Sequence, residues 1–371
     1  MDSGWVLWWL GGMLLCSGII IRSFSPTITL GASSADLGGK TLTLPLNFEI
    51  TVFANDSVSN FMIQSPRPMA DLSDTLNHYF TFEVTPRYFG CVRTVSDTLL
   101  YTQRWDTLPQ AKFWQMVMGM RRDSCIVNVS SSRRIVEVKA SYWWESLTDS
   151  LQNRYKDSIR QALHLGEDEG IYITAGKRHY YAFDKVLHSI SEGVAVFEQK
   201  GVDPWYAQAI LLIESPGKLQ YSPVGAYGSF QLMEDVAREH GLIVNDSIDE
   251  REDFPKAAGA AADLIASRCI PQTRHMLRKR GITFDEKQLW FRLLVLHSYH
   301  AGAGNVDGVL EIIKPTEGGQ ELMKRVWTTE YKGFKNASQN YSQVALASIL
   351  KLDEILSALP DSVCRDSIVI M

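Results

Sequence analysis

The sequence predicts an α+β domain followed by an all-α domain, with an apolar N-terminal stretch that indicates a membrane segment. Three observations support this prediction: residues 5–21 carry no charge, residues 41–175 mix alternating and helical patterns, and residues 180–371 show helical periodicity. The length of 371 residues is enough for roughly two or three domains. Hydrophobic residues at 45% and charged residues at 21% are typical of a globular protein and exclude a disordered or fibrous chain.

Residues 1–22 are interpreted as a signal sequence or a single membrane anchor. Their charge-free run is shorter than the ~20 apolar residues of a spanning helix but falls within the lower range. The n-region holds Asp2 and no Lys or Arg, and no small-x-small cleavage site follows closely, which favours an uncleaved anchor. Cys16 follows two leucines, so lipid attachment has little support, and a buried N-terminal helix is the structural alternative.

Residues 23–40 are rich in Ser and Gly and are expected to form a linker. Residues 41–175 are expected to form the small α+β domain, whose role the sequence does not indicate; one candidate role is recruitment of a protein partner. Its local signals are a strand near residues 41–53, a short buried helix at 111–120, a hairpin at 125–142 and an amphipathic helix at 146–163.

Residues 180–371 are expected to form the helical domain. One helix should end at Gly201, a favourable C-cap, and the next should begin at Asp203 and Pro204, a favourable N-cap and first helical residue. Further helices are expected in the Ala-rich stretch 255–270, in the almost wholly apolar stretch 286–302 and in residues 340–359.

Glu214 is the first candidate for chemistry in this domain. It follows the apolar residues 210–213 and precedes Ser-Pro-Gly, so we expect it at a helix C-terminus in dry surroundings. Desolvation and the negative end of the helix dipole both raise the pKa of a carboxyl group. A carboxyl that stays protonated near neutral pH can act as a general acid, whereas the alternative is a helix-end Glu that points into water.

The segment after Glu214 carries a second signal. Residues 222–228 read SPVGAYG, a tight turn rich in Ser and Gly, and SFQLM is expected to start a helix that carries the amide of Gln231 toward a ligand. A Ser-Tyr-His-Ala-Gly stretch at residues 298–302 closes the apolar helix, and an Asn-Tyr pair at residues 340–341 opens the last one.

These three motifs, in this order, resemble those of SLT-type lytic transglycosylases of the goose-lysozyme-like superfamily. The resemblance implies a lysozyme-like catalytic fold and cleavage of peptidoglycan between N-acetylmuramic acid and N-acetylglucosamine, with 1,6-anhydro ends. It implies that Glu214 acts first as general acid and then as the base that activates the muramyl C6 hydroxyl. The substrate-binding residues that it implies are Ser222, Gln231, Tyr299, His300 and Tyr341. Core packing for Tyr299 and turn capping for Ser222 are the structural alternatives.

The sequence departs from the family pattern at two places. His300 stands where the family has Asn, and the segment from Glu214 to Gln231 is one residue shorter. Two alternative functions stay open: a muramidase that uses Glu234 or Asp235 as a second carboxylate, and a non-catalytic peptidoglycan-binding scaffold. We interpret Glu234 and Asp235 as solvated helix residues.

No cofactor or metal is expected, because the cysteines lack the C-x-x-C spacing of a metal or redox site. The net charge of -5 gives no basic footprint, so nucleic acid is not an expected partner. The expected partners are peptidoglycan glycan strands and the membrane, on the periplasmic side of a bacterial cell envelope. Disulfides and free buried thiols are equally open for Cys91, Cys125, Cys269 and Cys364.

Overall fold

A computed structural model describes residues 93–181, 183–214 and 221–358, apart from the side chain of residue 184, together with the backbone of strands outside these ranges. The chain divides into two compact units, Met1–Gly90 and Cys91–Met371. The boundary therefore falls inside the stretch 41–175 that was predicted as one domain. The predicted signal or anchor at residues 1–22 lies outside the fully described residues. Within those residues, no helix combines the length and the apolar character that crossing a membrane requires.

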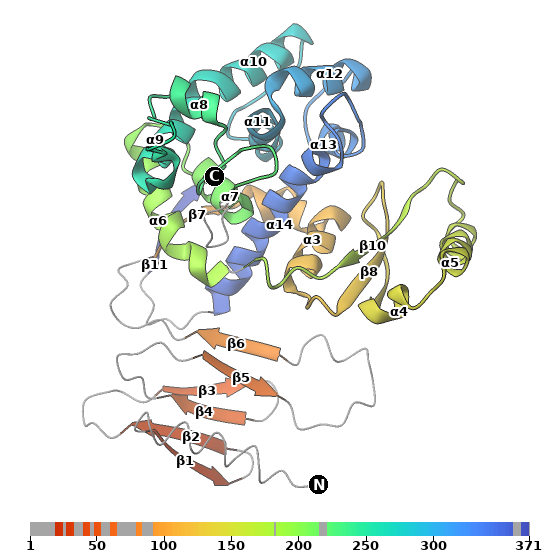
Figure 1. Cartoon of the computed structure of the whole chain (residues 1–371), viewed down its shortest axis with the longest axis vertical. Helices are drawn as coiled ribbons and strands as arrows, with labels where there is room; N and C mark the ends of the chain where they lie inside the picture. Colours follow the sequence, from red (N-terminus) through yellow and green to blue (C-terminus); the bar gives the residue numbers. More distant parts are fainter. Residues whose placement is uncertain are drawn as a thin grey trace. The chain divides into compact units, whose positions relative to one another are not determined.

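In the first unit the part of the backbone that the structure describes forms six strands (Figure 1). Four of them form a sheet in the order β1-β2-β4-β3, and β5 pairs with β6. The strand signal near residues 41–53 coincides with the antiparallel pair β3 and β4. The bounds are β1 Ile19–Phe24, β2 Thr27–Ala32, β3 Lys40–Leu44, β4 Phe48–Val52, β5 Asn60–Gln64 and β6 Tyr79–Glu83.

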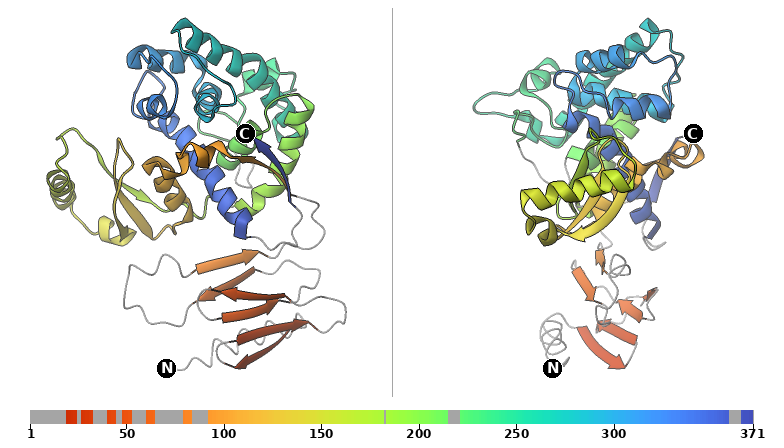
Figure 2. Two further views of the ribbon diagram at one scale, coloured as in Figure 1. Left: turned by 180° about the vertical axis from the view of Figure 1, so that it is seen from behind. Right: turned by 90° about the vertical axis from the view of Figure 1, so that its right-hand side faces the viewer.

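The second unit includes a small three-stranded lobe, which follows a helix that packs in the main core. The predicted buried helix and hairpin are confirmed as α3 (Pro109–Gly119) and the antiparallel pair β8 (Ser124–Val129) and β9 (Ile135–Ala140). Strand β10 (Ile171–Ala175) adds to the other side of β8, and the predicted amphipathic helix is α5 (Asp149–Ala162). This lobe projects to one side of the helices in Figures 1 and 2. Its apolar cluster consists of Val127, Val129, Ile159 and Ile171.

Helices make up most of the second unit, as predicted. In chain order, α2 is Leu99–Thr102, α4 is Ser141–Glu145, α6 is Phe183–Gln199, α7 is Trp205–Glu214, α8 is Glu234–Glu239, α9 is Phe254–Leu264, α10 is Ile270–Lys279, α11 is Leu289–Ala301, α12 is Ala303–Ile313, α13 is Gln320–Val326 and α14 is Asn336–Ala358. Short helical turns occupy Trp105–Thr107 and Glu250–Glu252, and Ile265–Cys269 is a π-helix between α9 and α10. Strand β7 (Val92–Asp97) pairs in parallel with β11 (Arg365–Ile370), a pairing that local sequence patterns did not predict.

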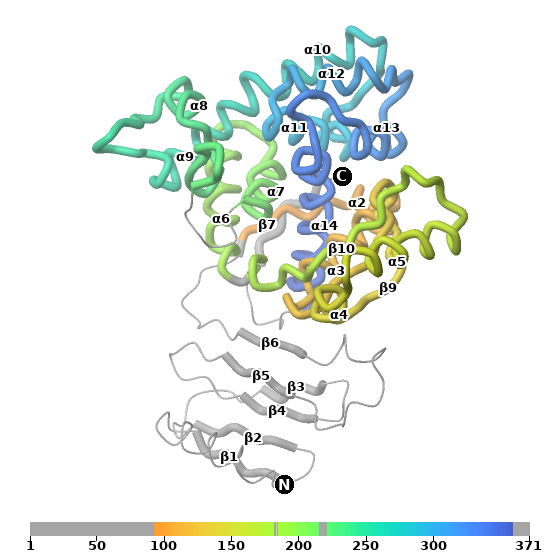
Figure 3. The backbone as a smooth tube through the Cα atoms, turned by 45° about the vertical axis from the view of Figure 1, so that its right-hand side comes forward, coloured from red at the N-terminus to blue at the C-terminus, as the bar shows by residue number. Residues whose placement is uncertain are grey.

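Helices α7, α11 and α14 form the centre of this unit (Figure 3). In α7 every residue from Trp205 to Ile213 is buried, and Glu214 ends the helix. The start of α7 is fixed by Asp203, which caps the N–H of Trp205 at 3.0 Å, as predicted. Asp203 also accepts a 2.9 Å bond from Arg292 of α11, whose guanidinium binds Asp97 at 3.0 Å. Since a buried cation must be paired, this triad sets the position of α7.

The stretch SFQLM does not start a helix, and that part of the prediction is wrong. Gln231 has a left-handed φ of 46°, and Tyr227 and Leu232 form an antiparallel bridge around it. Helix α8 begins only at Glu234. The bridge keeps the chain in a tight loop because the backbone N–H groups of Tyr227 and Leu232 are bonded to each other's carbonyls.

Candidate active site

Glu214 lies at the C-terminal end of α7 and is partly exposed. Burial of its carboxyl raises the pKa to about 7, and the nearby Tyr341 opposes this by lowering it. The cause is desolvation, because the charged form loses water that the apolar helix end does not replace. Near neutral pH a large fraction of Glu214 therefore keeps its proton, as the sequence predicted.

Four tyrosines lie near enough to this carboxyl for its charge to act on them. The negative charge of Glu214 contributes to a raised pKa at each of them, second to burial at Tyr180, Tyr299 and Tyr341 and third at Tyr181. Tyr299 and Tyr341 were predicted site residues, whereas Tyr180 and Tyr181 were missed. The two missed residues lie just before α6, in a stretch whose only local signal is a Tyr-Tyr pair.

Of these four tyrosines, Tyr341 alone interacts with Glu214 through hydrogen bonding as well as through charge. Its side chain is only 4% exposed, and its hydroxyl makes no hydrogen bond of standard geometry to another described residue. The hydroxyl is nevertheless near enough to Glu214 to shift the pKa of both groups. An unsatisfied buried hydroxyl is costly, and a hydrogen bond from Tyr341 to the Glu214 carboxylate would satisfy it.

The position of Tyr341 is fixed by the residues behind it. Ser342 accepts a 2.8 Å bond from the indole of Trp327 and lies 2.7 Å from Nε2 of His297 on α11. Because the indole can only donate, the Ser342 hydroxyl has its proton free for His297. Burial lowers the pKa of His297 to about 3, so the imidazole is neutral and acts as an acceptor.

His300 stacks on the other side of Tyr341. Their ring centroids are 4.2 Å apart with an angle of 16° between the planes. His300 is exposed at the surface, but desolvation by the groups packed around its ring lowers the pKa to about 4. The ring is therefore neutral at physiological pH, and a neutral imidazole can donate one hydrogen bond and accept another.

Tyr299 connects this group to the loop after Glu214. Its hydroxyl donates a 2.6 Å bond to the carbonyl of Phe230. In that loop Gln231 donates from its amide to the carbonyl of Gly228 at 3.0 Å. The Ser222 hydroxyl accepts the N–H of Ala226 at 2.9 Å, which matches the alternative that Ser222 caps a turn.

Arg251, which the sequence did not single out, braces the same loop. It is 3% exposed, and its guanidinium donates to the carbonyls of Gly225 at 3.0 Å and Leu232 at 3.1 Å. Asp249 holds the guanidinium through a 2.6 Å ion pair. The loop therefore keeps its shape through a side chain about twenty residues further along the chain, which no local pattern reveals.

Glu234 and Asp235 do not join the group around Glu214. Both pair with Arg238 on α8, Asp235 at 3.9 Å, and the Asp235 side chain is 94% exposed. This matches their interpretation as solvated helix residues.

No metal-binding cluster of three His, Cys, Asp or Glu residues occurs among the described residues. Cys125 and Cys269 are free and buried, and burial raises the pKa of Cys269 to about 12. A protonated, buried thiol is unreactive. Cys16, Cys91 and Cys364 lie outside the described residues. The two alternatives for Cys91 and Cys364, a disulfide or a free thiol, therefore stay predictions.

The comparison with known protein families identifies the class of the helical part. Residues 195–314 match the family model described as "Transglycosylase SLT domain". The matched segment contains Glu214, the loop after it and His300, but ends before Tyr341. The resemblance to SLT-type lytic transglycosylases is thereby confirmed, and the helical fold of this part fits a lysozyme-like SLT domain. No curated protein matched the chain.

Proposed function

We propose that this protein is a peptidoglycan lytic transglycosylase that works in a bacterial cell envelope, with Glu214 as its catalytic residue. The observation that carries the proposal is the carboxyl of Glu214, which has a pKa raised to about 7 and faces Tyr341 inside a segment similar to SLT domains. A general acid works best when its pKa lies near the operating pH.

In the first step the Glu214 carboxyl gives its proton to the glycosidic oxygen, and the bond from that oxygen to C1 of N-acetylmuramic acid breaks. The resulting carboxylate then takes the proton of the muramyl C6 hydroxyl. The C6 oxygen attacks C1 and closes a 1,6-anhydro ring, so no water is consumed. Tyr341 would hold the carboxylate between the two steps by donating its hydrogen bond, which a carboxylate accepts more strongly than a neutral acid.

One carboxyl group is sufficient for this sequence of steps, whereas an inverting hydrolase needs a second one on the far side of the sugar. Glu234 and Asp235, the candidates for that second group, are paired with Arg238. This arrangement favours the transglycosylase over the muramidase. Ser222, Gln231, Tyr299 and His300 are proposed to border the bound glycan.

The test is mass spectrometry of the soluble products after the purified full chain is incubated with peptidoglycan sacculi, beside a Glu214→Gln control. Products with 1,6-anhydro-muramyl ends that are absent from the control would support the proposal. Reducing ends would indicate the muramidase instead. Retention on sacculi without any released product would indicate a binding scaffold.

A further inference from the structure

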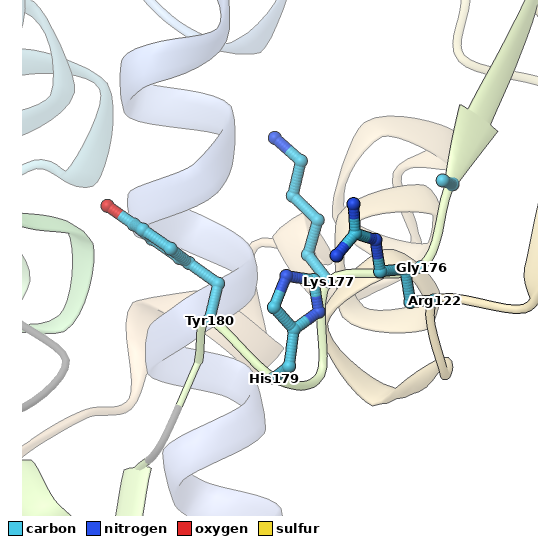
Figure 4. A pocket seen from close by; sticks show the side chains of 6 residues that line it. Arg122, Gly176, Lys177, His179 and Tyr180 are labelled. Atoms are coloured by element: carbon cyan, nitrogen blue, oxygen red, sulfur yellow. The ribbon is translucent and has the colours of Figure 1, made fainter.

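A cavity lies near Glu214 but outside the segment that matches the family model. Its volume is about 270 Å³, and its lining residues are Arg122, Ala175, Gly176, Lys177, His179 and Tyr180 (Figure 4). Arg122 comes from the turn before β8, and the other five come from the end of β10 and the turn after it. Tyr180 connects the cavity with the active site, because the charge of Glu214 acts on its hydroxyl.

Three basic side chains gather around this cavity. Figure 4 shows Lys177 and His179 on the turn after β10, with Arg122 beside them on a separate segment. Within the described residues neither the Arg122 guanidinium nor the Lys177 ammonium has a carboxylate partner, and Lys177 contacts the ring of Trp114 at 6.0 Å. The whole chain has a net charge of -5, so this local positive charge is not a general property of the surface. Unpaired cations around a hollow attract an anionic group.

The turn that carries these groups has a fixed backbone. The N–H groups of Gly176, Lys177 and Arg178 donate to three carbonyls of neighbouring segments at 2.9, 2.7 and 2.9 Å. A Cβ atom at Gly176 would lie 2.2 Å from the carbonyl oxygen of Arg121, so only glycine allows this close approach. A turn that is ordered before binding loses little entropy when it binds a ligand.

We infer that this cavity binds a carboxylate of the peptide that is attached to the muramyl residue at the cleavage site. The inference rests on the proposed function, because that function brings this muramyl residue to Glu214. The peptide hangs from the sugar whose C1–oxygen bond breaks, and it carries free carboxylates. A cavity of about 270 Å³ is smaller than the ~300–1,000 Å³ of most ligand pockets, so it suits a peptide end better than a sugar chain. The protein would thus prefer strands that still carry their peptides.

The test compares two substrates with the full-length protein: peptide-bearing glycan strands, and the same strands after an amidase has removed the peptides. The quantity measured is the ratio of kcat/KM on the first substrate to kcat/KM on the second. The test variant is Arg122→Gln with Lys177→Gln. The matched control is Lys112→Gln with Arg154→Gln, which removes the same charge at two exposed positions outside the cavity.

For the wild-type protein and the control we expect a ratio of about ten, because two charged contacts at a half-open site contribute roughly this much. In the Arg122→Gln and Lys177→Gln variant the ratio should fall to about one. A wild-type ratio near one, or a variant that keeps the wild-type ratio, would overturn the inference while anhydro-ended products still supported the proposed function. If neither substrate gives anhydro-ended products, the proposed function fails and the inference fails with it.

Discussion

Arg133 donates a 2.8 Å hydrogen bond to the side-chain oxygen of Asn340, the residue that precedes Tyr341. It lies in the turn between β8 and β9, is 7% exposed and places its guanidinium 5.3 Å from the ring centre of Phe113. Burial lowers the pKa of this guanidinium. The contact therefore attaches the three-stranded lobe to α14 beside the candidate active site.

Replacing Arg133 with alanine is expected to lower the free energy of unfolding by ~2–4 kcal/mol, because it leaves a cavity and two amide groups without their donor. Those two groups belong to Asn340 and Asn128, the second at 3.3 Å. Denaturant unfolding measures the change. Arg134→Ala, at an exposed neighbouring position, is the control and should change stability by no more than ~0.5 kcal/mol. Equal losses of unfolding free energy in both variants would show that the buried Arg133 contributes no more to stability than its exposed neighbour.

The pH dependence of activity should follow the ionisation of Glu214. Only the protonated carboxyl can act as the acid, so kcat/KM should fall as pH rises, with a midpoint near its pKa of about 7. His300 has a pKa lowered to about 4 and is already neutral there, so His300→Asn should leave this midpoint in place. A midpoint near the ordinary pKa of Glu, or a midpoint that shifts in the His300→Asn variant, would argue against Glu214 as the acid.

Tyr341→Phe should move the same midpoint to higher pH. The phenol lowers the pKa of Glu214 by stabilising the carboxylate, and phenylalanine removes this effect while it keeps the ring that stacks on His300. A pH profile of kcat/KM measures the shift. Tyr221→Phe is the matched control, since Tyr221 is 61% exposed and stacks on Tyr227 instead. A downward shift, or an equal shift in the control, would contradict the assigned contact.

The helices and the position of Glu214 at the end of α7 could be predicted from the sequence because their signals are local. The apolar run before Glu214 and the cap at Asp203 describe α7 without any distant contact. The loop after Glu214 could not be predicted in the same way, because its shape depends on Arg251, which lies far from it along the chain. Tyr180 was missed for a similar reason: it approaches Glu214 only through the packing of the lobe on the helices.

Glu214→Gln should stabilise the protein at high pH but not at low pH. In the folded state the pKa of Glu214 is about 7, above the ordinary value of 4.5. The contribution of the protonated Glu214 to the free energy of unfolding is therefore complete below pH 4.5 and is lost as pH rises through 7. Glutamine carries no charge and avoids that loss, which is on the order of 3 kcal/mol. Unfolding at pH 4 and pH 8 measures the difference between the two proteins. Glu317→Gln, an exposed control, should show the same difference at both pH values.

Alanine substitutions at two glycines in the loop after Glu214 separate the effect of backbone strain from that of a steric collision. Gly225 and Gly228 have φ angles of 91° and 80°, so alanine is strained at both. A Cβ at Gly225 would meet open space, whereas one at Gly228 would lie 2.1 Å from the carbonyl oxygen of Arg251. Gly225→Ala should therefore cost about 1 kcal/mol. Gly228→Ala should lower the free energy of unfolding by ~3 kcal/mol or more, because Arg251 must move away from the new Cβ.

The same pair of variants tests whether the brace shapes the active site. Gly228→Ala forces Arg251 away from the loop that receives the Tyr299 bond at Phe230, so release of soluble glycan should fall at a temperature where the variant is still folded. Gly225→Ala places its Cβ in open space, where it does not collide with Arg251, and should keep most of its activity. Thermal midpoints and product release, measured side by side, give both quantities. If the two variants lost stability and activity equally, backbone strain alone would account for both losses. The contact with Arg251 would then have no role in shaping the active site.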